Sequence, residues 1–249
     1  MKRLLITGAT GFVGRACLPW FDRQKWEIHT VSRNIDEHIP QVHSHCADMK
    51  EPREIRALLQ NVKPTHLLHA AWCTNPKDFW HSPDNHEWLE ASLELFETFV
   101  ECGGSRIVGL GSCAEYDWNQ GICTEHETPC RPTTPYGEAK LAAGRYLDQL
   151  GRQGISTAWT RLFFMYGPGA SIDRMPGSVI SAISRGEPAL CSTGEQRRDF
   201  LYIQDVARAI VAILESGATG PINVCSGSAI SIASMAEQAA RLMDGESLL

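Results

Sequence analysis

The sequence predicts an α/β fold in which a parallel sheet is covered by helices on both faces. Short apolar runs alternate with longer segments of helical periodicity along most of the 249 residues, as in repeated strand–helix–strand units. A glycine-rich turn follows the first apolar run and directly precedes the first helical segment. This length suits one large domain with a small second region.

The expected elements follow in order along the chain. Strands are expected where short apolar runs stop at glycine or polar residues, and helices where apolar residues recur every three or four positions. Pro19 is expected to weaken or kink the first helix, and Gly103-Gly104 to end the third. The expected strands are 4–6, 26–31, 66–71, 107–110 and 156–163, and the expected helices are 12–23, 52–61, 84–102, 137–151, 204–215 and 231–243.

Composition and charge argue against several classes of protein. A hydrophobic fraction of 43% and a charged fraction of 21% are ordinary for a soluble globular protein. The net charge of -6 argues against nucleic-acid binding, and no apolar run approaches the length of a membrane span. The chain has no signal peptide and its nine cysteines form no CxxC pair, so reduced thiols and a cytoplasmic location are expected.

The segment 7–14 reads TGATGFVG and has the glycine spacing of a phosphate-binding turn. Gly8 permits a tight turn, Gly11 lets the backbone approach a pyrophosphate, and Gly14 lets the helix and strand pack closely. Free N–H groups at the start of the helix then face the phosphates. The sequence therefore predicts a Rossmann-type doubly wound sheet that binds a dinucleotide through Gly8, Thr10, Gly11, Phe12, Val13 and Gly14.

The end of the second expected strand bears on the choice of dinucleotide. An NAD enzyme usually has Asp or Glu there, against the ribose 2′-hydroxyl, whereas this chain has Ser32, Arg33 and Asn34. A guanidinium can accept a 2′-phosphate, which a carboxylate would repel. These three residues are therefore expected at the cofactor, and NADP(H) is favoured, with NAD(H) left open as the alternative.

Tyr136 and Lys140 are four residues apart in an expected helix, so they lie on one helix face. A nearby ammonium lowers the pKa of a tyrosine because it favours the phenolate. The phenol can then exchange a proton with a substrate oxygen while a hydride moves at the same carbon. Ser112 follows the strand that ends at Leu110 and can polarise a carbonyl. Ser112, Tyr136 and Lys140 are therefore the expected catalytic residues.

Taken together, these motifs resemble the extended short-chain dehydrogenase/reductase superfamily, in particular the NAD-dependent epimerase/dehydratase family. The resemblance covers nearly the whole chain. Its motifs, in chain order, are the glycine turn at 7–14, Cys46-Ala47-Asp48, His69-Ala70-Ala71, the catalytic triad, the RxxxxYGPG-like segment 161–169 and the RDFxxVxDV-like segment 198–206. The resemblance implies further cofactor contacts at Asp48, Met49, Ala70, Ala71, Trp72, Tyr136, Lys140 and Phe163.

The resemblance also implies a function, because family members mostly act on nucleotide-linked sugars. Sugar dehydratases of the family carry Asp-Glu directly after the catalytic Ser or Thr, whereas Cys113 and Ala114 follow Ser112 here. Reduction and epimerisation need only the triad. The leading expectation is therefore NADP(H)-dependent reduction of a nucleotide-linked 4-keto-(6-deoxy)sugar with Tyr136 as proton donor. The alternatives are an epimerase with retained NAD and a non-catalytic dinucleotide-binding sensor or scaffold.

The expected division of the chain is a dinucleotide-binding domain at 1–164, rejoined at about 200–220, and a small substrate-binding region at 165–249. The resemblance implies that this region is shortened, because the chain stops at Leu249. Substrate contacts are expected from Cys113, Tyr116, Arg197 and Arg198. Two alternatives stay open, a reactive thiol at Cys113 and a structural ion pair of Arg198 with Asp199 or Asp205.

Three further expectations concern metals, aromatic residues and assembly. His43, His45, Cys46, His66 and His69 fit no compact ligand spacing, so no metal site is expected. Trp72 is expected to touch the nicotinamide or substrate, whereas Trp88 fits helix packing. Trp88 also aligns with an asparagine usual in the family, and whether Asn85 takes its place is left open. The resemblance implies a homodimer through 84–102.

Overall fold

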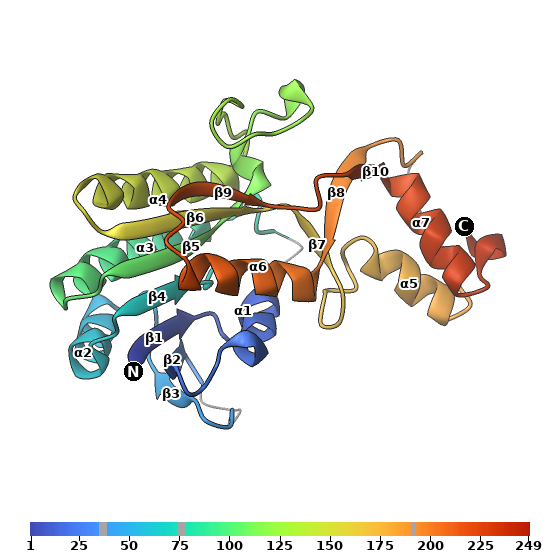
Figure 1. Ribbon diagram of the computed structural model, residues 1–249. Helices are drawn as coiled ribbons and strands as arrows, with labels where there is room; N and C mark the ends of the chain where they lie inside the picture. Colours follow the sequence, from blue (N-terminus) through green and yellow to red (C-terminus); the bar gives the residue numbers. More distant parts are fainter. Residues whose placement is uncertain (35–38, 74–77, 191–192) are drawn as a thin grey trace. The chain divides into compact units, whose positions relative to one another are not determined.

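The computed structural model describes residues 1–34, 39–73, 78–190 and 193–249. Seven strands form one sheet in the order β3-β2-β1-β4-β5-β6-β9, and every neighbouring pair is parallel (Figure 1). The strands are Lys2–Thr7 (β1), Trp26–Ser32 (β2), His43–Cys46 (β3), His66–His69 (β4), Arg106–Ser112 (β5), Ser156–Leu162 (β6) and Gly220–Val224 (β9). The predicted Rossmann-type α/β fold is therefore confirmed.

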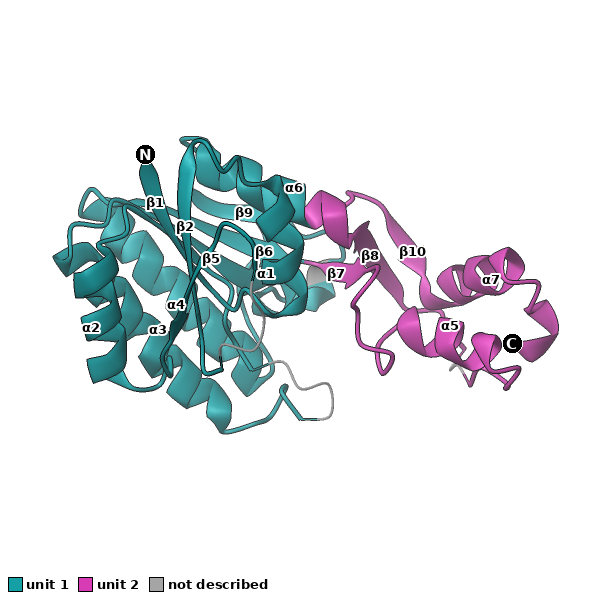
Figure 2. Ribbon diagram, turned by 90° about the horizontal axis from the view of Figure 1, so that it is seen from below, with its two compact units in different colours: residues 1–162, 207–224 teal, residues 163–206, 225–249 magenta. Residues whose placement is uncertain are grey.

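Helices cover both faces of the sheet. Figures 1 and 2 show α2, α3 and α4 on one face and α1 and α6 on the other. Their bounds are Phe12–Cys17 (α1), Pro52–Val62 (α2), Asp84–Glu101 (α3), Pro135–Arg152 (α4) and Ile203–Glu215 (α6). The strand order reverses direction at β1 and β4, so the carboxyl ends of these two strands flank the crevice where doubly wound sheets bind ligands.

The first 162 residues and the strand Gly220–Val224 show the following departures from the expected elements. The predicted helix 12–23 is wrong beyond Cys17, where a 3₁₀ turn takes over at Leu18–Trp20 (η1) with Pro19 inside it, because proline cannot continue an α-helix. The strand expected at 66–71 ends at His69. Strands β3 and β9 were not expected, since β3 is a half-buried edge strand and β9 contains Pro221.

By its internal contacts the chain divides into two compact units (Figure 2). The first unit comprises 1–162 and 207–224 and contains the seven-stranded sheet. The second comprises 163–206 and 225–249. It holds the three-stranded sheet β10-β8-β7 and two helices. Their bounds are Phe164–Tyr166 (β7), Gly177–Ser184 (α5), Arg197–Tyr202 (β8), Ala229–Ser231 (β10) and Ile232–Leu242 (α7).

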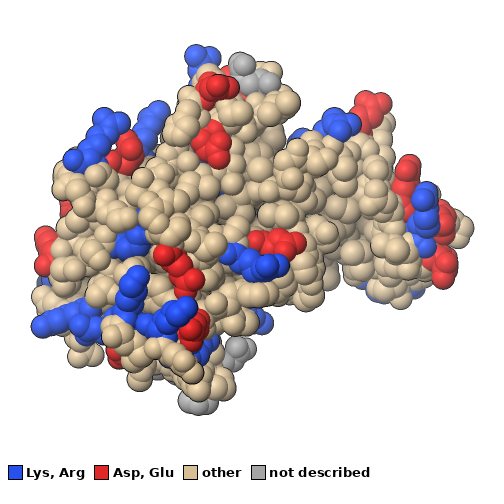
Figure 3. Space-filling view, in the orientation of Figure 1, with Lys and Arg blue, Asp and Glu red and all other residues tan. Residues whose placement is uncertain are grey.

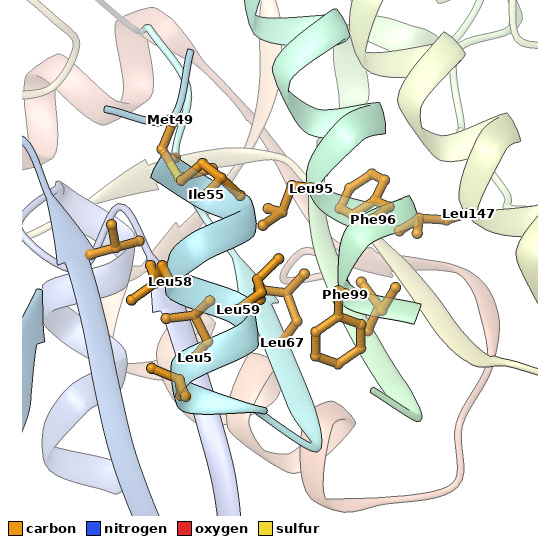
Figure 4. Close-up of a cluster of buried hydrophobic side chains, with 14 of the residues drawn as sticks. Leu5, Met49, Ile55, Leu58, Leu59, Leu67, Leu95, Phe96, Phe99 and Leu147 are labelled. Atoms are coloured by element: carbon orange, nitrogen blue, oxygen red, sulfur yellow. The ribbon is translucent and has the colours of Figure 1, made fainter. Parts of the chain in front are cut away.

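One hydrophobic core cluster lies between the sheet and the helices α2, α3 and α4. Leu5 of β1 and Leu67 of β4 point toward Leu59 of α2 and Phe99 of α3 (Figure 4), and all four side chains are fully buried. Full burial of such a side chain is worth about 1.5–3 kcal/mol. This packing holds the carboxyl ends of β1, β4 and β5 in fixed order, which is where the predicted site residues lie.

The charges on one face of the molecule and the state of the described cysteines bear on the expectations from composition. Acidic and basic side chains are interspersed over the face drawn in Figure 3. Within the described ranges, no helix is both long and apolar enough to cross a membrane. Among the described residues, free thiols are found at Cys17, Cys46, Cys73, Cys102, Cys113 and Cys130, and Cys191 lies outside the described residues.

Candidate active site

The glycine turn lies between β1 and α1 and packs against the segment that follows β4. Gly8 has a φ of +68°, and a Cβ at this residue would lie 2.6 Å from Ala71 N and 2.8 Å from Ala70 O. A Cβ on Gly14 would overlap the Gly8 carbonyl. Both positions therefore exclude a side chain, as a dinucleotide turn requires, so the residues present fit the cofactor that the motif implies.

His69, at the end of β4, fixes the position of this turn. Its Nδ1 lies 2.8 Å from Thr7 Oγ1, and its Nε2 lies 2.9 Å from Ser92 Oγ. Because the Ser92 hydroxyl already donates to the Trp88 carbonyl, Nε2–H donates to Ser92 and Nδ1 accepts from Thr7. Burial and then the charge of Lys140 lower the pKa of His69 to about 3. A neutral imidazole thus ties β1, β4 and α3 together beside the turn.

The remaining cofactor candidates of the first unit lie at the ends of β2 and β3. Ser32 is the last residue of β2, and its hydroxyl donates to the Asn34 carbonyl at 2.6 Å. Arg33 is exposed, and no described residue forms an ion pair with it. Asp48 follows β3 and accepts from the Lys50 N–H at 2.9 Å, while Met49 is buried in the core. Among these side chains, the exposed Arg33 guanidinium is the one that can bind a negatively charged group of a ligand.

Ser112 is the last residue of β5 and caps the 3₁₀ turn Cys113–Glu115 (η2). Its Oγ accepts from the Ala114 N–H at 3.2 Å, and its own N–H donates to Glu115 Oε1 at 2.8 Å. This reciprocal capping holds the Ser112 side chain in place at the carboxyl edge of the sheet. The Ser112 residue is 9% exposed.

Tyr136 lies in the first turn of α4, which begins at Pro135 with Thr134 as its cap. The Tyr136 N–H donates to the Trp80 carbonyl at 3.2 Å. A Cβ on Gly137 would lie 2.6 Å from the Ala114 carbonyl, so the start of α4 approaches η2 as closely as a glycine allows. Ala114 packs with Tyr136 and Phe79 in one apolar cluster. The phenol of Tyr136 is thereby brought to the segment that carries Ser112.

Lys140 lies one helical turn after Tyr136 and is 4% exposed. Its Nζ donates to the Leu110 carbonyl at 2.9 Å and lies 6.0 Å from the centre of the Tyr136 ring. Burial lowers the pKa of Lys140 to about 7, against the opposing charge of Glu115. Lys140 therefore lies near the Tyr136 ring, as the spacing of the two residues predicts.

Glu115 anchors the floor of the site through a fully buried ion pair. Its carboxylate accepts from Arg161 Nε at 2.8 Å, from Trp159 Nε1 at 2.9 Å and from the Ser112 N–H. The charge of Glu115 holds the pKa of Arg161 above its usual range despite burial. Arg161 is 7% exposed, so both partners of this pair are withdrawn from solvent.

Two of the expected substrate contacts, Tyr116 and Cys113, are buried. Tyr116 is 1% exposed, its hydroxyl donates to Asn223 Oδ1 at 2.7 Å and accepts from Arg161 Nη1 at 2.9 Å. This arrangement gives Tyr116 a structural role in joining η2 to β6 and β9, in place of the expected substrate contact. Cys113 is 6% exposed, and burial raises the pKa of its thiol to about 12, which disfavours the reactive-thiolate alternative.

Phe163, Arg197 and Arg198 belong to the second unit. Phe163 is the first residue of the second unit and is half-buried. Arg197 in β8 is exposed and donates through Nη2 to the Ala229 carbonyl of β10. The guanidinium of Arg198 lies 5.3 Å from the centre of the Phe164 ring, and its Nη1 donates to the Arg197 carbonyl. The two arginines thus lie on the small sheet of this unit.

The structure shows what Asn85 contacts, and it adds Trp159, which the motifs did not single out. Asn85 is 1% exposed and accepts from Trp72 Nε1 at 3.0 Å, so it acts on the indole and not on the triad directly. Trp159 fills the space left by Gly109, Gly111 and Gly144, none of which has room for a Cβ beside the indole. Closely spaced glycines in a strand next to a helical glycine are the signal that points to such a buried ring.

The family model of the NAD dependent epimerase/dehydratase family matches residues 4–225. Similar curated proteins include CDP-abequose synthase of Yersinia pseudotuberculosis, 23% identical over 86% of this chain and 74% of that protein. GDP-L-fucose synthase of Sinorhizobium fredii is 26% identical over 97% of this chain and 80% of that protein. Each alignment spans most of both chains.

Solved structures show the same fold. UDP-glucose 4-epimerase of Thermus thermophilus, in complex with NAD, superimposes with a TM-score of 0.85 at 22% identity and covers 97% of this chain and 83% of that one. MoeE5, in complex with UDP-glucose and NAD, gives a TM-score of 0.81 at 29% identity over 96% of this chain and 81% of that one. With the glycine turn and the triad in place, the chain belongs to the NAD dependent epimerase/dehydratase family and is an NAD(P)-dependent enzyme of the extended short-chain dehydrogenase type.

Proposed function

We propose that this enzyme modifies a nucleotide-linked sugar, and specifically that it reduces a 4-keto-6-deoxy sugar with NADPH. The observation that carries this proposal is the packing of Ala114 on Tyr136 and Phe79. Dehydratases of the family carry Asp-Glu directly after the catalytic Ser or Thr, whereas Cys113 and Ala114 follow Ser112 here, and a charge at Ala114, buried against two aromatic rings, would be costly. The site therefore has the groups for hydride and proton exchange and lacks an acid pair for elimination.

The cofactor would be held by residues at the carboxyl ends of β1, β2, β3 and β4. The backbone around Gly8, Gly11 and Gly14 accommodates the pyrophosphate, with Thr10, Phe12 and Val13 in the same turn. Ser32, Arg33 and Asn34 would contact the adenosine ribose, where the Arg33 guanidinium favours a 2′-phosphate. Asp48 and Met49 lie toward the adenine, and Ala70, Ala71 and Trp72 toward the nicotinamide. When bound, the cofactor supplies the hydride.

The protein would supply the proton and fix the direction of its transfer. Tyr136 donates its hydroxyl proton to the C4 oxygen of the sugar as that oxygen gains charge. Ser112 donates a hydrogen bond to the same oxygen and stabilises the developing charge. The Lys140 ammonium favours the phenolate that remains on Tyr136, because the two charges are opposite.

The substrate residues outside the triad are proposals of the same kind. Arg197 and Arg198 are assigned to the diphosphate, since guanidinium groups bind phosphate by paired, charge-assisted hydrogen bonds. The second unit is accordingly proposed as the substrate-binding region, and Phe163 as a cofactor contact at its start. We also propose a homodimer that assembles through α3.

An epimerase with retained NAD is the second candidate. Its support is the fold shared with UDP-glucose 4-epimerase of Thermus thermophilus in complex with NAD. Reduction and epimerisation differ in whether reduced cofactor is consumed. A sensor or scaffold without turnover is disfavoured because Ser112, Tyr136 and Lys140 are all retained.

The test is the consumption of NADPH with a nucleotide-linked 4-keto-6-deoxy sugar, followed by absorbance of the reduced nicotinamide. The wild-type protein should turn over, and Tyr136→Phe should lower kcat by about 10²–10⁴-fold because the proton donor is lost. Tyr136→Phe should still quench NADPH fluorescence, which shows that the cofactor site is intact. Full activity in Tyr136→Phe would overturn the assignment. Interconversion of two sugars without net use of NADPH would favour the epimerase.

A further inference from the structure

The Lys140 ammonium lies in a box of three aromatic rings. Its Nζ is 3.7 Å from the centre of the Trp72 ring, 5.9 Å from that of Trp159 and 6.0 Å from that of Tyr136. An ammonium within about 6 Å of a ring centre is attracted by the negative face of the ring, and tryptophan attracts it most strongly. Trp72 therefore makes by far the closest of these contacts.

A hydrogen bond from the indole N–H of Trp72 fixes the orientation of its ring. Its Nε1 donates to Asn85 Oδ1 at 3.0 Å. The Asn85 amide nitrogen donates to the Phe79 carbonyl at 2.7 Å and to the Ser82 carbonyl at 2.9 Å, so the amide oxygen has to face the indole. Asn85 is 1% exposed, and Trp88 stacks on Trp72 at 6.4 Å. The indole face toward Lys140 is thus set by a buried network.

The charged groups around Lys140 do not by themselves offset the free-energy cost of removing its ammonium from water. Glu115 is the acid that faces it from η2, but Glu115 is already paired with Arg161 of β6. His69 of β4 is neutral, and Tyr136 lies on the same helix as Lys140. Removal from water disfavours the ammonium, and a single carbonyl, that of Leu110, accepts from it among the described residues. A ring face in contact with Nζ opposes this penalty.

We propose that Trp72 is a positioning residue for the reaction, which holds the Lys140 side chain in its cationic form and in place behind Tyr136, with Asn85 as the anchor of the indole. This inference rests on the proposed function for its kinetic consequence only. The state of Lys140 itself can be observed in the protein without any substrate.

The first experiment follows the titration of Lys140 by NMR. The chain has six lysines, so ¹³C-lysine labelling gives a small set of Cε signals, and Lys140→Arg identifies the one to follow. We expect the midpoint for Lys140 to be about one pH unit lower in Trp72→Leu, which has no ring, than in the wild type. Trp72→Phe keeps a ring face and should fall between the two.

Trp20→Leu is the matched control. Trp20 is an exposed indole that lies under Arg208 at 5.2 Å, so this variant removes the same group from a cation elsewhere in the chain. It should leave the Lys140 midpoint unchanged. Equal midpoints in wild type, Trp72→Phe and Trp72→Leu would overturn the proposal and leave Trp72 a packing residue. A Trp72→Leu midpoint at or above that of the wild type would do the same.

The second experiment measures the pH profile of kcat/KM. If Lys140 must be cationic, activity falls as the pH rises through its titration, and Trp72→Leu should lose activity at lower pH than the wild type. Lowering the pH should then restore much of the kcat of Trp72→Leu, which a merely misfolded site would not allow. A uniform loss at every pH would contradict the positioning role. A shifted NMR midpoint without reductase activity in the wild type would instead refute the proposed function alone.

Discussion

At the scale of single residues, the chemistry of the site comes from surroundings that a motif does not reveal. The Tyr136/Lys140 spacing places two side chains on one helix face, but the burial of Lys140 lowers its pKa to about 7. Tyr116 follows the catalytic segment and resembles a pocket residue in sequence, yet its hydroxyl is bonded to Asn223 and Arg161. Each outcome is decided by neighbours from distant parts of the chain.

Arg33 gives a prediction at this scale. If its guanidinium receives a 2′-phosphate, Arg33→Ala should raise the Kd for NADPH by about 10–100-fold, the value of a charge-assisted hydrogen bond, with little change for NADH. Arg33→Asp should raise the Kd for NADPH further, because like charges would meet. Titration by cofactor fluorescence measures both. Tighter binding of NADH than of NADPH by the wild type would contradict the assignment.

At the scale of elements, the site depends on how β5, η2, α4 and β6 meet. Glu115 joins three of them, because it caps Ser112 and pairs with Trp159 and Arg161 of β6. Gly137 lets the start of α4 contact η2. Ser112 and Tyr136 are thus placed by one buried acid and by the missing side chain of Gly137.

Glu115→Gln should destabilise the fold by about 3–5 kcal/mol, because it leaves the buried Arg161 without a counter-charge. Chemical denaturation gives this value directly. Arg152→Ala removes an exposed ion pair with Asp148 and should cost no more than about 0.5 kcal/mol. If the two variants are equally stable, the buried pair is not a structural anchor.

The packing of α4 on β6 gives a second prediction about how the elements meet. A Cβ on Gly144 would lie 2.6 Å from Trp159 Nε1, the atom that donates to Glu115. Gly144→Ala should therefore lower stability by about 1–3 kcal/mol through overpacking. Gly217→Ala is the comparison, since no atom lies within 4 Å of a Cβ there. A melting temperature of Gly144→Ala at or above that of Gly217→Ala would show that the indole can move aside.

At the scale of the whole molecule, buried histidines are a common feature of the sheet. His66 and His69 lie in β4, and burial is the largest cause that lowers the pKa of His66 to about 4 and of His69 to about 3. In the β2–β3 pair, His29 stacks on His43 and His45, and its pKa is also lowered. The folded state thus keeps several imidazoles neutral.

These histidines predict loss of stability in mild acid. The pKa values of His29, His66 and His69 are lower in the folded than in the unfolded chain, where about 6.5 is usual, so the unfolded state binds more protons below that pH. His69 alone should remove about 1.4 kcal/mol for each pH unit between about 6.5 and 3. Urea midpoints at pH 8, 6 and 5 measure the slope. His66→Gln should flatten it, whereas a change at the exposed His126, His126→Gln, should not.

The fold could be predicted further than the site. Regular apolar runs and the glycine turn were enough for the order of strand and helix through β6, because both signals are local. β3 and β9 were not predicted. β3 is an edge strand with two histidines, β9 contains Pro221, and neither has the apolar pattern of a buried strand. The proximity of Lys140 to Tyr136 was predictable from spacing, but the partnership of Trp72, Asn85 and Lys140 was not. It joins the segment after β4 to α3 and α4, and only the fold brings those segments together.

The chain leaves the seven-stranded sheet twice to build its second unit, once after β6 and once after β9, and these two strands are neighbours. Insertions or exchanges in 163–206 and 225–249 therefore need not disturb the register of β5, the strand that ends at Ser112. This arrangement makes the second unit a replaceable module. Grafting these two segments from a relative onto the present sheet would test whether the second unit sets sugar specificity, as proposed above.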